Sequence, residues 1–138
     1  MLRKSITGRN KYGNTRFFAD NQKWDSKKEY QRYLVLKDAE KKGAISNLRR
    51  QVKFELLPPV TEEFVEHLKT KDKVKQKVIQ RCVSFIADFT YQKGDELIVE
   101  DVKISKSLLP KEYILKKKMM LALLGIKVKE SFSVNDAI

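Results

Sequence analysis

The sequence predicts a single α/β domain in which a mixed β-sheet is flanked by helices, an arrangement that buries one side of each element. A chain of 138 residues with 41% hydrophobic side chains is long enough to form one core. Apolar and polar residues alternate in several short segments, as in strands, and follow helical spacing in two longer segments. The predicted order is a short hairpin, a helix, three strands, a helix and a final strand.

Residues 1–14 are predicted to form a flexible basic arm, and residues 15–138 the folded domain. The arm combines Arg9 and Lys11 with glycine and asparagine residues, and it includes Tyr12. Basic terminal segments of this kind lie along phosphate backbones. The arm is therefore a candidate contact for nucleic acid.

Two short apolar runs separated by Asp20 and Asn21 predict a hairpin over residues 15–24. Ser26 is a suitable N-cap for the helix that follows. Gly43 is expected to end this helix, because glycine readily adopts the left-handed conformation found after helix C-termini.

A strand is expected over residues 47–57, where two prolines end it. The segment 61–68 begins with a helical cap signal and has no glycine or proline, which favours a helix. Lysines alternate with other residues over 69–77. This pattern fits a helix end, a loop or the start of a strand.

Two further strands are predicted over about 79–91 and 96–103, joined by a turn that contains Gly94. A helix is predicted from Pro110 to about residue 124, because proline is common at the first turn of a helix. A final strand is expected over residues 126–130. The apolar face of the second helix is predicted to contain Tyr113, Met120, Leu121 and Leu124.

Lysine and arginine outnumber the acidic residues by 30 to 18, which gives a formal net charge of +12. A field of this strength attracts polyanions, so nucleic acid is the first expected partner and an anionic membrane the second. No apolar run is long enough to span a bilayer and no signal peptide is visible, so a cytoplasmic protein is expected. The single Cys82 is expected in the core and His67 in solvent, without a cluster that would bind zinc.

The most informative segment is the predicted strand pair with Asp88 on one strand and Asp101 and Lys103 on the next. Residues 101 and 103 point to the same face because side chains alternate along a strand. Asp88 interrupts an apolar run, where a charge is costly unless it is paired or bound to a metal. The pattern fits a divalent-metal site beside a lysine, as phosphodiester hydrolysis requires. Pairing of Asp88 with a lysine at the end of a buried strand fits equally well.

Glu29 has two interpretations. It lies three residues after Ser26, which is the spacing of a capping box, where the carboxylate returns to the helix N-terminus. Alternatively, its side chain points from the helix toward the strand pair and adds a third carboxylate to Asp88 and Asp101. The spacing alone favours the capping role.

Six segments, taken in their order and spacing, resemble the PD-(D/E)XK nuclease superfamily. Within it, the chain is similar to phage junction-resolving endonucleases and archaeal Holliday-junction resolvases, and most similar to a phage-encoded family of small basic proteins. The segments are spread over nearly the whole chain: Lys11–Asn14, Trp24–Glu29, Phe54–Leu56, Ile86–Phe89, Val99–Lys103 and Tyr113–Lys116.

The resemblance implies a restriction-endonuclease-like core and a Mg²⁺-dependent endodeoxyribonuclease, with Mn²⁺ as the alternative cation. It implies that Asp88, Asp101 and Glu29 are metal ligands, together with the carbonyl oxygen of Val102. It also implies that Lys103 orients the attacking water or helps to deprotonate it.

Three positions depart from the pattern of the superfamily. Ala87 stands where a proline often precedes the first acid, Asp101 where glutamate is more common, and Ile104 where glycine is frequent. Glu100 is predicted to point to the face opposite to that of Asp101. None of these departures removes a functional group, but each affects the geometry of the ligands.

The implied substrate is branched or duplex DNA, and symmetric cleavage of two strands favours a homodimer. The side chains expected to contact DNA come from the N-terminal region and both helices: Arg9, Lys11, Tyr12, Arg16, Lys27, Lys111, Lys116 and Lys117. Two other functions fit the sequence. The first is a non-catalytic nucleic-acid-binding protein with structural acids, and the second is a scaffold that binds a host protein through a degenerate nuclease fold.

Overall fold

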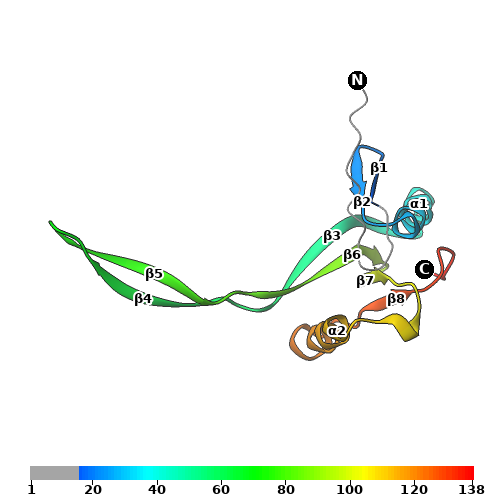
Figure 1. Ribbon diagram of the computed structural model, residues 1–138. Coiled ribbons are helices and arrows are strands. Elements are labelled where there is room, and N and C mark those ends of the chain that lie inside the picture. The colour runs from blue at the N-terminus through cyan, green and yellow to red at the C-terminus, as the bar shows by residue number, and fades with distance from the viewer. Residues whose placement is uncertain (1–15) are drawn as a thin grey trace, which may run out of the picture.

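The structure is a computed structural model that describes residues 16–138 (Figure 1). Its body is built on a four-stranded sheet with the order β3-β6-β7-β8. The strands are β3 (Ser46–Leu57), β6 (Val83–Lys93), β7 (Glu96–Val102) and β8 (Lys129–Ser131). Antiparallel pairing joins β3 to β6 and β6 to β7, whereas β7 and β8 run parallel. The predicted mixed sheet is therefore confirmed.

Two α-helices flank this sheet, α1 (Lys27–Lys41) and α2 (Lys111–Leu124). The Ser26 hydroxyl caps α1 by accepting a hydrogen bond from the backbone N–H of Glu29 at 3.1 Å. Gly125 ends α2 in the left-handed conformation, which glycine adopts without steric cost. A short 3₁₀ turn, η1 (Lys106–Leu108), connects β7 to α2.

The predicted N-terminal hairpin is present as β1 (Phe17–Ala19) and β2 (Gln22–Trp24). Asp20 and Asn21 both have positive φ angles, 51° and 58°, as a two-residue type I′ turn requires. Trp24 ends the hairpin in a fully buried position, and its indole N–H donates to the carbonyl of Ala19 at 3.0 Å. The hairpin is thereby anchored to the body.

The body contains two apolar clusters, one with each helix. The cluster of α1 comprises Trp24, Leu36, Ala39, Ile45, Phe89 and Tyr91. The cluster of α2 comprises Leu56, Phe85, Ala87, Val99, Tyr113, Met120 and Val128. Strand β6 contributes to both, because Phe85 and Ala87 lie in one and Phe89 and Tyr91 in the other. Asp88 therefore lies on the strand that joins the two clusters.

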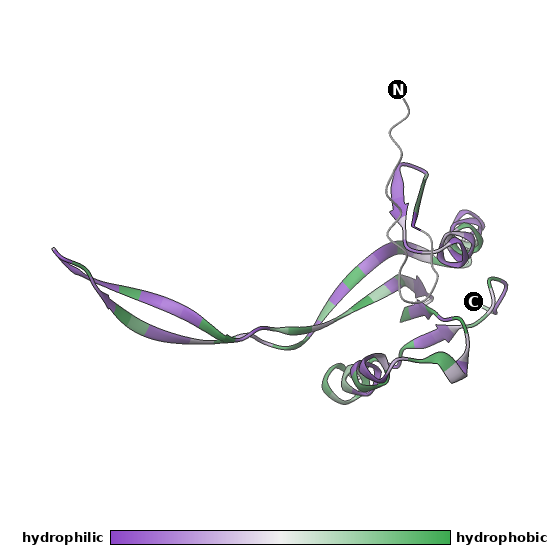
Figure 2. Ribbon diagram, viewed as in Figure 1, coloured by the Kyte–Doolittle hydropathy of each residue, from purple (hydrophilic) through white to green (hydrophobic). Residues whose placement is uncertain are grey.

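Residues 60–80, which we term the distal ribbon, form an antiparallel strand pair of β4 (Val60–His67) and β5 (Asp72–Gln80). The predicted helix over 61–68 is wrong. The ribbon is a separate two-stranded sheet, and Figure 1 shows it projecting far from the body. Figure 2 shows hydrophilic and hydrophobic residues alternating along it. The cap signal was outweighed by cross-strand pairing, which joins residues 5 to 20 positions apart, whereas helical contacts join residues three or four positions apart.

Three smaller differences concern the ends of predicted elements. On α2, Tyr113 and Met120 are buried as predicted, but Leu121 and Leu124 are exposed. The final strand begins at Lys129 rather than at residue 126, because Ile126 and Val128 pack in the core ahead of it. Cys82 is half-buried between the ribbon and β6 rather than in the core.

His67 lies on the ribbon in solvent, as predicted, and contacts Asp72 at 2.9 Å. Within residues 16–138, neither helix combines the length and the apolar character needed to cross a membrane. The predicted arm of residues 1–14 lies outside the described part of the chain.

Candidate active site

Asp88 and Asp101 meet where the backbone pairing of β6 with β7 ends. The last backbone pair in that direction is Phe89 with Glu100, so the next position brings the two aspartates opposite each other. The backbone N–H of Asp88 donates to Oδ1 of Asp101 at 3.1 Å, and the N–H of Val102 donates to Oδ2 of Asp88 at 2.8 Å. Each carboxylate thus bonds the opposite strand, and the predicted proximity of Asp88 and Asp101 is present.

Lys103 lies directly beside this pair. Its Nζ is 2.7 Å from Oδ2 of Asp101 and 3.7 Å from the centroid of the Tyr113 ring. An ammonium over an aromatic face is attracted by the ring quadrupole, so Tyr113 helps to hold Lys103 against Asp101. The phenol of Tyr113 in turn donates to Oε2 of Glu130 at 3.0 Å. The side chain of Lys103 is therefore positioned by contacts from β7 and α2, and Glu130 on β8 holds Tyr113 in place.

Glu29 points away from its own helix end. Its backbone N–H completes one half of a capping box with Ser26, but its carboxylate Oε1 accepts from Nε2 of Gln51 at 3.0 Å and from Nη2 of Arg50 at 3.4 Å. The guanidinium of Arg50 lies 3.3 Å from the centroid of the Trp24 ring, which restricts its position. The carboxylate of Glu29 thus faces β3 and does not return to the helix N-terminus.

Gln51 is the residue on β3 that lies opposite Asp88. It falls between the pairs Arg50–Phe89 and Val52–Ala87 in the register of β3 with β6. Its φ angle of 51° is uncommon for a residue with a side chain, and such strained positions concentrate at functional sites. Asp88 on the central strand is therefore flanked by Asp101 on one side and by the residue that binds Glu29 on the other.

The electrostatics of the site follow from burial. Burial raises the pKa of Asp88 well above its usual value, and the charges of Asp101 and then Glu29 raise it further. Burial also raises the pKa of Glu29, although the charge of Arg50 and the bond from Gln51 oppose this shift. Asp88 is half-buried and forms no ion pair of its own within residues 16–138, so a cation at its carboxylate would be stabilising.

Only part of the predicted acidic cluster is assembled. In the described chain, no three His, Cys, Asp or Glu side chains come close enough together to form a metal-binding group. Arg50 and Gln51 hold the carboxylate of Glu29 on the side of β3, whereas Asp88 and Asp101 are in mutual contact through the strand pair. The assembled core of the site is therefore Asp88, Asp101 and Lys103.

Glu100 has a separate structural role. Its carboxylate lies on the other face of β7, as alternation predicts, and forms a fully buried ion pair with Arg32 at 2.7 Å. Arg32 also donates to the carbonyls of Val134 at 2.9 Å and Asp136 at 2.6 Å. This arrangement ties α1 and the C-terminal segment to the strand that carries Asp101.

The site opens into a shallow cavity of about 360 Å³. Asp101, Lys103 and Tyr113 form one part of its wall, and Ile86 and Lys116 form another. The Nζ of Lys116 pairs with Glu112 at 2.9 Å. A ligand in this cavity therefore meets the Asp101–Lys103 pair and a second lysine together.

Comparison with known proteins adds a family. A family model described as "Protein of unknown function (DUF1064)" matches residues 9–134. The chain belongs to the DUF1064 family. Neither the curated proteins nor the solved structures contain a match to it.

In this DUF1064 family member, the residues predicted to contact DNA have different surroundings. Lys27 and Lys111 are exposed on the first turns of α1 and α2. Arg16 pairs with Asp25 at 3.3 Å, and Lys117 pairs with Glu130 at 2.5 Å. Lys116 lines the cavity beside Asp101. Arg9, Lys11 and Tyr12 lie outside the described residues.

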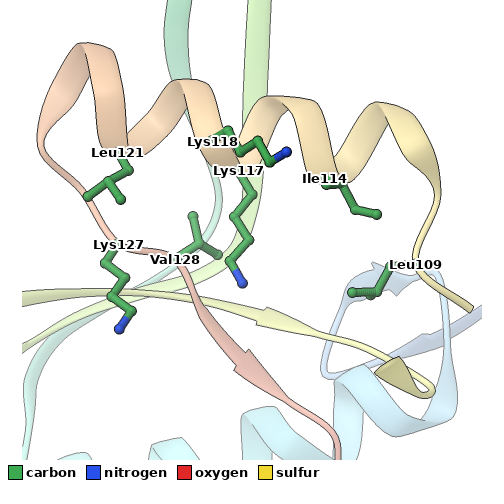
Figure 3. Close-up of a pocket in the computed structure, with 7 residues that line it drawn as sticks. All are labelled: Leu109, Ile114, Lys117, Lys118, Leu121, Lys127 and Val128. Carbon is green, nitrogen blue, oxygen red and sulfur yellow. The ribbon is translucent and has the colours of Figure 1, made fainter. Parts of the chain in front are cut away.

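A second cavity, of about 400 Å³, lies between α2 and the segment that leads into β8. Figure 3 shows Leu109, Ile114, Leu121 and Val128 around it, with the lysines of positions 117, 118 and 127 at its margin. Its lining has no carboxylate, hydroxyl or thiol group. It is an apolar groove at the surface and is separate from the Asp88–Asp101 pair.

Sequence reasoning missed three residues that shape the site. Arg50 and Gln51 bind Glu29, and Lys28 donates to the carbonyl of Lys103 at 2.7 Å, which holds the end of β7. The only indication in the sequence that Lys28 lies near the site is that it directly precedes Glu29. Nothing in the sequence indicated the roles of Arg50 and Gln51, because a glutamine within a predicted strand gives no sign that its backbone has a positive φ angle.

Proposed function

We propose that the protein is a metal-dependent DNA endonuclease that hydrolyses phosphodiester bonds, with selectivity for branched DNA as in Holliday-junction resolvases. The observation that carries this proposal is that Asp101 bonds the backbone of Asp88 and pairs with Lys103, and that Asp101 and Lys103 line a cavity. Paired carboxylates beside an amine, on a chain of net charge +12, suit a polyanionic phosphodiester substrate.

The donor set fits Mg²⁺ or Mn²⁺, since these hard cations prefer carboxylate and carbonyl oxygens. Asp88 and Asp101 would hold the cation together with the carbonyl oxygen of Val102. Glu29, whose carboxylate is bound by Arg50 and Gln51, would bind the cation through water. Burial raises the pKa of Asp88, and the charges of Asp101 and Glu29 raise it further; this supports the fit, because a bound cation would offset both effects. When bound, the cation would supply Lewis-acid stabilisation of negative charge at the scissile phosphate.

The remaining roles belong to basic side chains. Lys103, held between Asp101 and the Tyr113 ring, would orient the attacking water and stabilise the charge that develops on the phosphate. Lys116, on the wall of the same cavity, would contact the neighbouring phosphate. Its role would be to position the DNA and not to take part in the bond cleavage.

Two broader features belong to the same proposal. A homodimer would present two such sites to the two strands that a resolvase cuts symmetrically. The proposed place of action is the cytoplasm, which for a phage-encoded protein is that of the bacterial host.

The decisive experiment uses labelled four-way junctions, flaps and linear duplexes with Mg²⁺, Mn²⁺ or EDTA. We expect cleavage of branched DNA only with a divalent cation. Asp88→Asn and Asp101→Asn should each abolish cleavage but keep or strengthen DNA binding, because negative charge near phosphate is removed. The control Asp95→Asn makes the same chemical change in the exposed turn of the same hairpin and should cleave normally.

One observation favours a second function, that of a non-catalytic DNA-binding protein. Asp88 and Asp101 each bond a backbone N–H of the opposite strand, which is a sufficient structural reason for two buried acids. Metal-independent binding of DNA without cleavage of any substrate, by a protein with intact folding, would establish this function and reject the nuclease.

A further inference from the structure

The distal ribbon contributes no residue to the two apolar clusters of the body. It pairs only as a separate two-stranded sheet and projects away from both apolar clusters (Figure 1). Isolated two-stranded hairpins are marginally stable in water. At about 3.4 Å per residue, the eight residues of β4 reach roughly 27 Å, so the ribbon is a long element exposed to solvent.

The charges of the ribbon are unevenly distributed along its length. Five of the nine residues from Lys69 to Lys77 are lysines, against a single aspartate. Lys73, Lys75 and Lys77 share one face of β5, because they alternate along the strand. Successive lysines on this face are roughly 7 Å apart, a repeat of two strand residues. The strand and the turn therefore present a row of positive charges.

The glutamates of β4 compensate the part of this row that lies on β5. Glu62 lies opposite Lys77, and Glu66 lies opposite Lys73 and forms an ion pair with Lys75. The turn beyond these pairs carries Lys69 and Lys71, and the nearest acid, Asp72 at the start of β5, contacts His67. The uncompensated charge is thus concentrated at the end of the ribbon.

We propose that the distal ribbon is a second DNA-binding element, which enters a groove of the duplex and places Lys69, Lys71 and Lys73 on the phosphates that border it. The major groove, about 12 Å wide, admits a two-stranded ribbon. This inference rests on the proposed function, since it takes DNA as the ligand.

The position of the ribbon defines which DNA it reaches. The chain from Asp88 to the end of the ribbon at Asp72 comprises sixteen residue steps, which span up to roughly 50 Å when extended. This distance corresponds to about 15 base pairs at 3.4 Å each. The ribbon therefore binds a segment of duplex distant from the cleaved bond, such as the outer part of one arm of a junction.

Charge favours DNA over a second copy of the chain at this place. Each copy carries a formal net charge of +12, so the positive end of one ribbon is repelled by the average surface of another copy. A polyanion gains from the same row of lysines through release of its counterions. Contact between two copies of the chain remains a possible result, which the experiment detects through a change in mass.

The experiment measures DNA binding in EDTA as a function of salt for the full chain and for the variant Lys69→Gln/Lys71→Gln/Lys73→Gln. We expect the slope of log K against log salt to fall by about 0.9 for each lysine removed, and the affinity at about 0.1 M salt to fall at least tenfold. The control Lys37→Gln/Lys41→Gln/Lys42→Gln removes the same charge from α1 and should keep the slope within about one unit of the parent.

Substrate length supplies a second readout. Junctions with arms of 20 base pairs should bind the parent at least tenfold more tightly than junctions with arms of 8 base pairs, because arms of roughly 27 Å end short of the ribbon. The ribbon variant should lose this preference. Cleavage at the short-armed junction should persist in the variant, since the ribbon does not reach the reacting phosphate.

The outcomes separate the two proposals. If the parent protein does not bind DNA, the proposed function and this inference both fail. If the parent binds and cleaves while the ribbon variant keeps the full slope and the preference for long arms, the inference fails alone. A ribbon variant that keeps the slope but changes in mass by light scattering would instead identify the ribbon as a contact between copies of the chain.

Discussion

The strand pairs β6–β7 and β4–β5 are both antiparallel and both carry charged residues, yet their surroundings differ completely. In the first pair, Asp101 is almost fully buried and Asp88 bonds the backbone of the opposite strand. In the second, even Val74 is 64% exposed. A charge in the first pair must be compensated by specific neighbours, whereas a charge in the ribbon is compensated by water.

This difference indicates where residue identity matters. The side chains of Lys103 and Arg32 are each held in one place by several contacts, so neither residue can be replaced by a neighbour. The ribbon lysines act through their number and spacing, and any one of them is replaceable by a neighbour. Buried charges therefore indicate chemistry or architecture, while exposed rows of charge indicate a polyanionic partner without identifying the contact atoms.

The largest predicted effect concerns the buried ion pair. Arg32→Met should lower the free energy of unfolding by about 3–5 kcal/mol, because it leaves the carboxylate of Glu100 buried without its partner. Urea denaturation followed by circular dichroism measures this change. The matched variant Lys75→Met breaks the ion pair with Glu66 on the ribbon and should cost less than about 1 kcal/mol. Equal losses in the two variants would contradict the contrast between the strand pairs.

The next effect concerns catalysis. Lys103→Met should reduce kcat for junction cleavage by about 100- to 1000-fold, because it removes the ammonium group beside Asp101. The affinity for DNA should change little. Single-turnover cleavage with Mg²⁺ measures kcat separately from binding. Lys93→Met, at the exposed end of the same hairpin, is the control and should retain activity. A loss confined to KM would show that Lys103 only binds substrate.

A third prediction compares apolar side chains. Met120→Ala should cost about 2–5 kcal/mol of unfolding free energy, because the side chain is fully buried in the cluster of α2 and leaves a cavity. Val74→Ala on the ribbon should cost less than about 1 kcal/mol, because little of its surface is removed from water on folding. Thermal unfolding of the two variants side by side provides the test, and a larger loss for Val74 would mean that the ribbon is packed against a partner in solution.

The smallest predicted effect comes from the largest change in sequence. Leu57 on β3 pairs with Val83 on β6, so replacing residues 58–82 by Asn-Gly should convert the two strands into a hairpin with a type I′ turn. The body should keep its unfolding free energy to within about 1 kcal/mol, because the ribbon contributes to neither apolar cluster. Failure of this shortened chain to fold would show that the ribbon supports the body.

The elements of the body could be predicted because their signals are local or arise from burial. Asp20 and Asn21 indicated the hairpin, Ser26 the start of α1, and Gly43 its end. Asp88 was informative because an acid inside an apolar run is costly, and its contact with Asp101 follows from the strand pair. The role of Glu29 was not predictable in the same way, since the capping spacing is satisfied by its backbone while its carboxylate binds Gln51.

The sequence by itself determined the mixed α/β body and the strong positive charge, and it indicated that Asp88 and Asp101 lie on neighbouring strands, because alternation, turn residues and the cost of buried charge act over short distances. Only the tertiary structure decided that residues 60–80 form a ribbon and that Arg32 neutralises Glu100. Both depend on residues that are brought together by folding. An alternating, solvated segment carries no burial signal that distinguishes a strand from a helix, and an ion pair between residues 68 positions apart leaves no pattern along the chain.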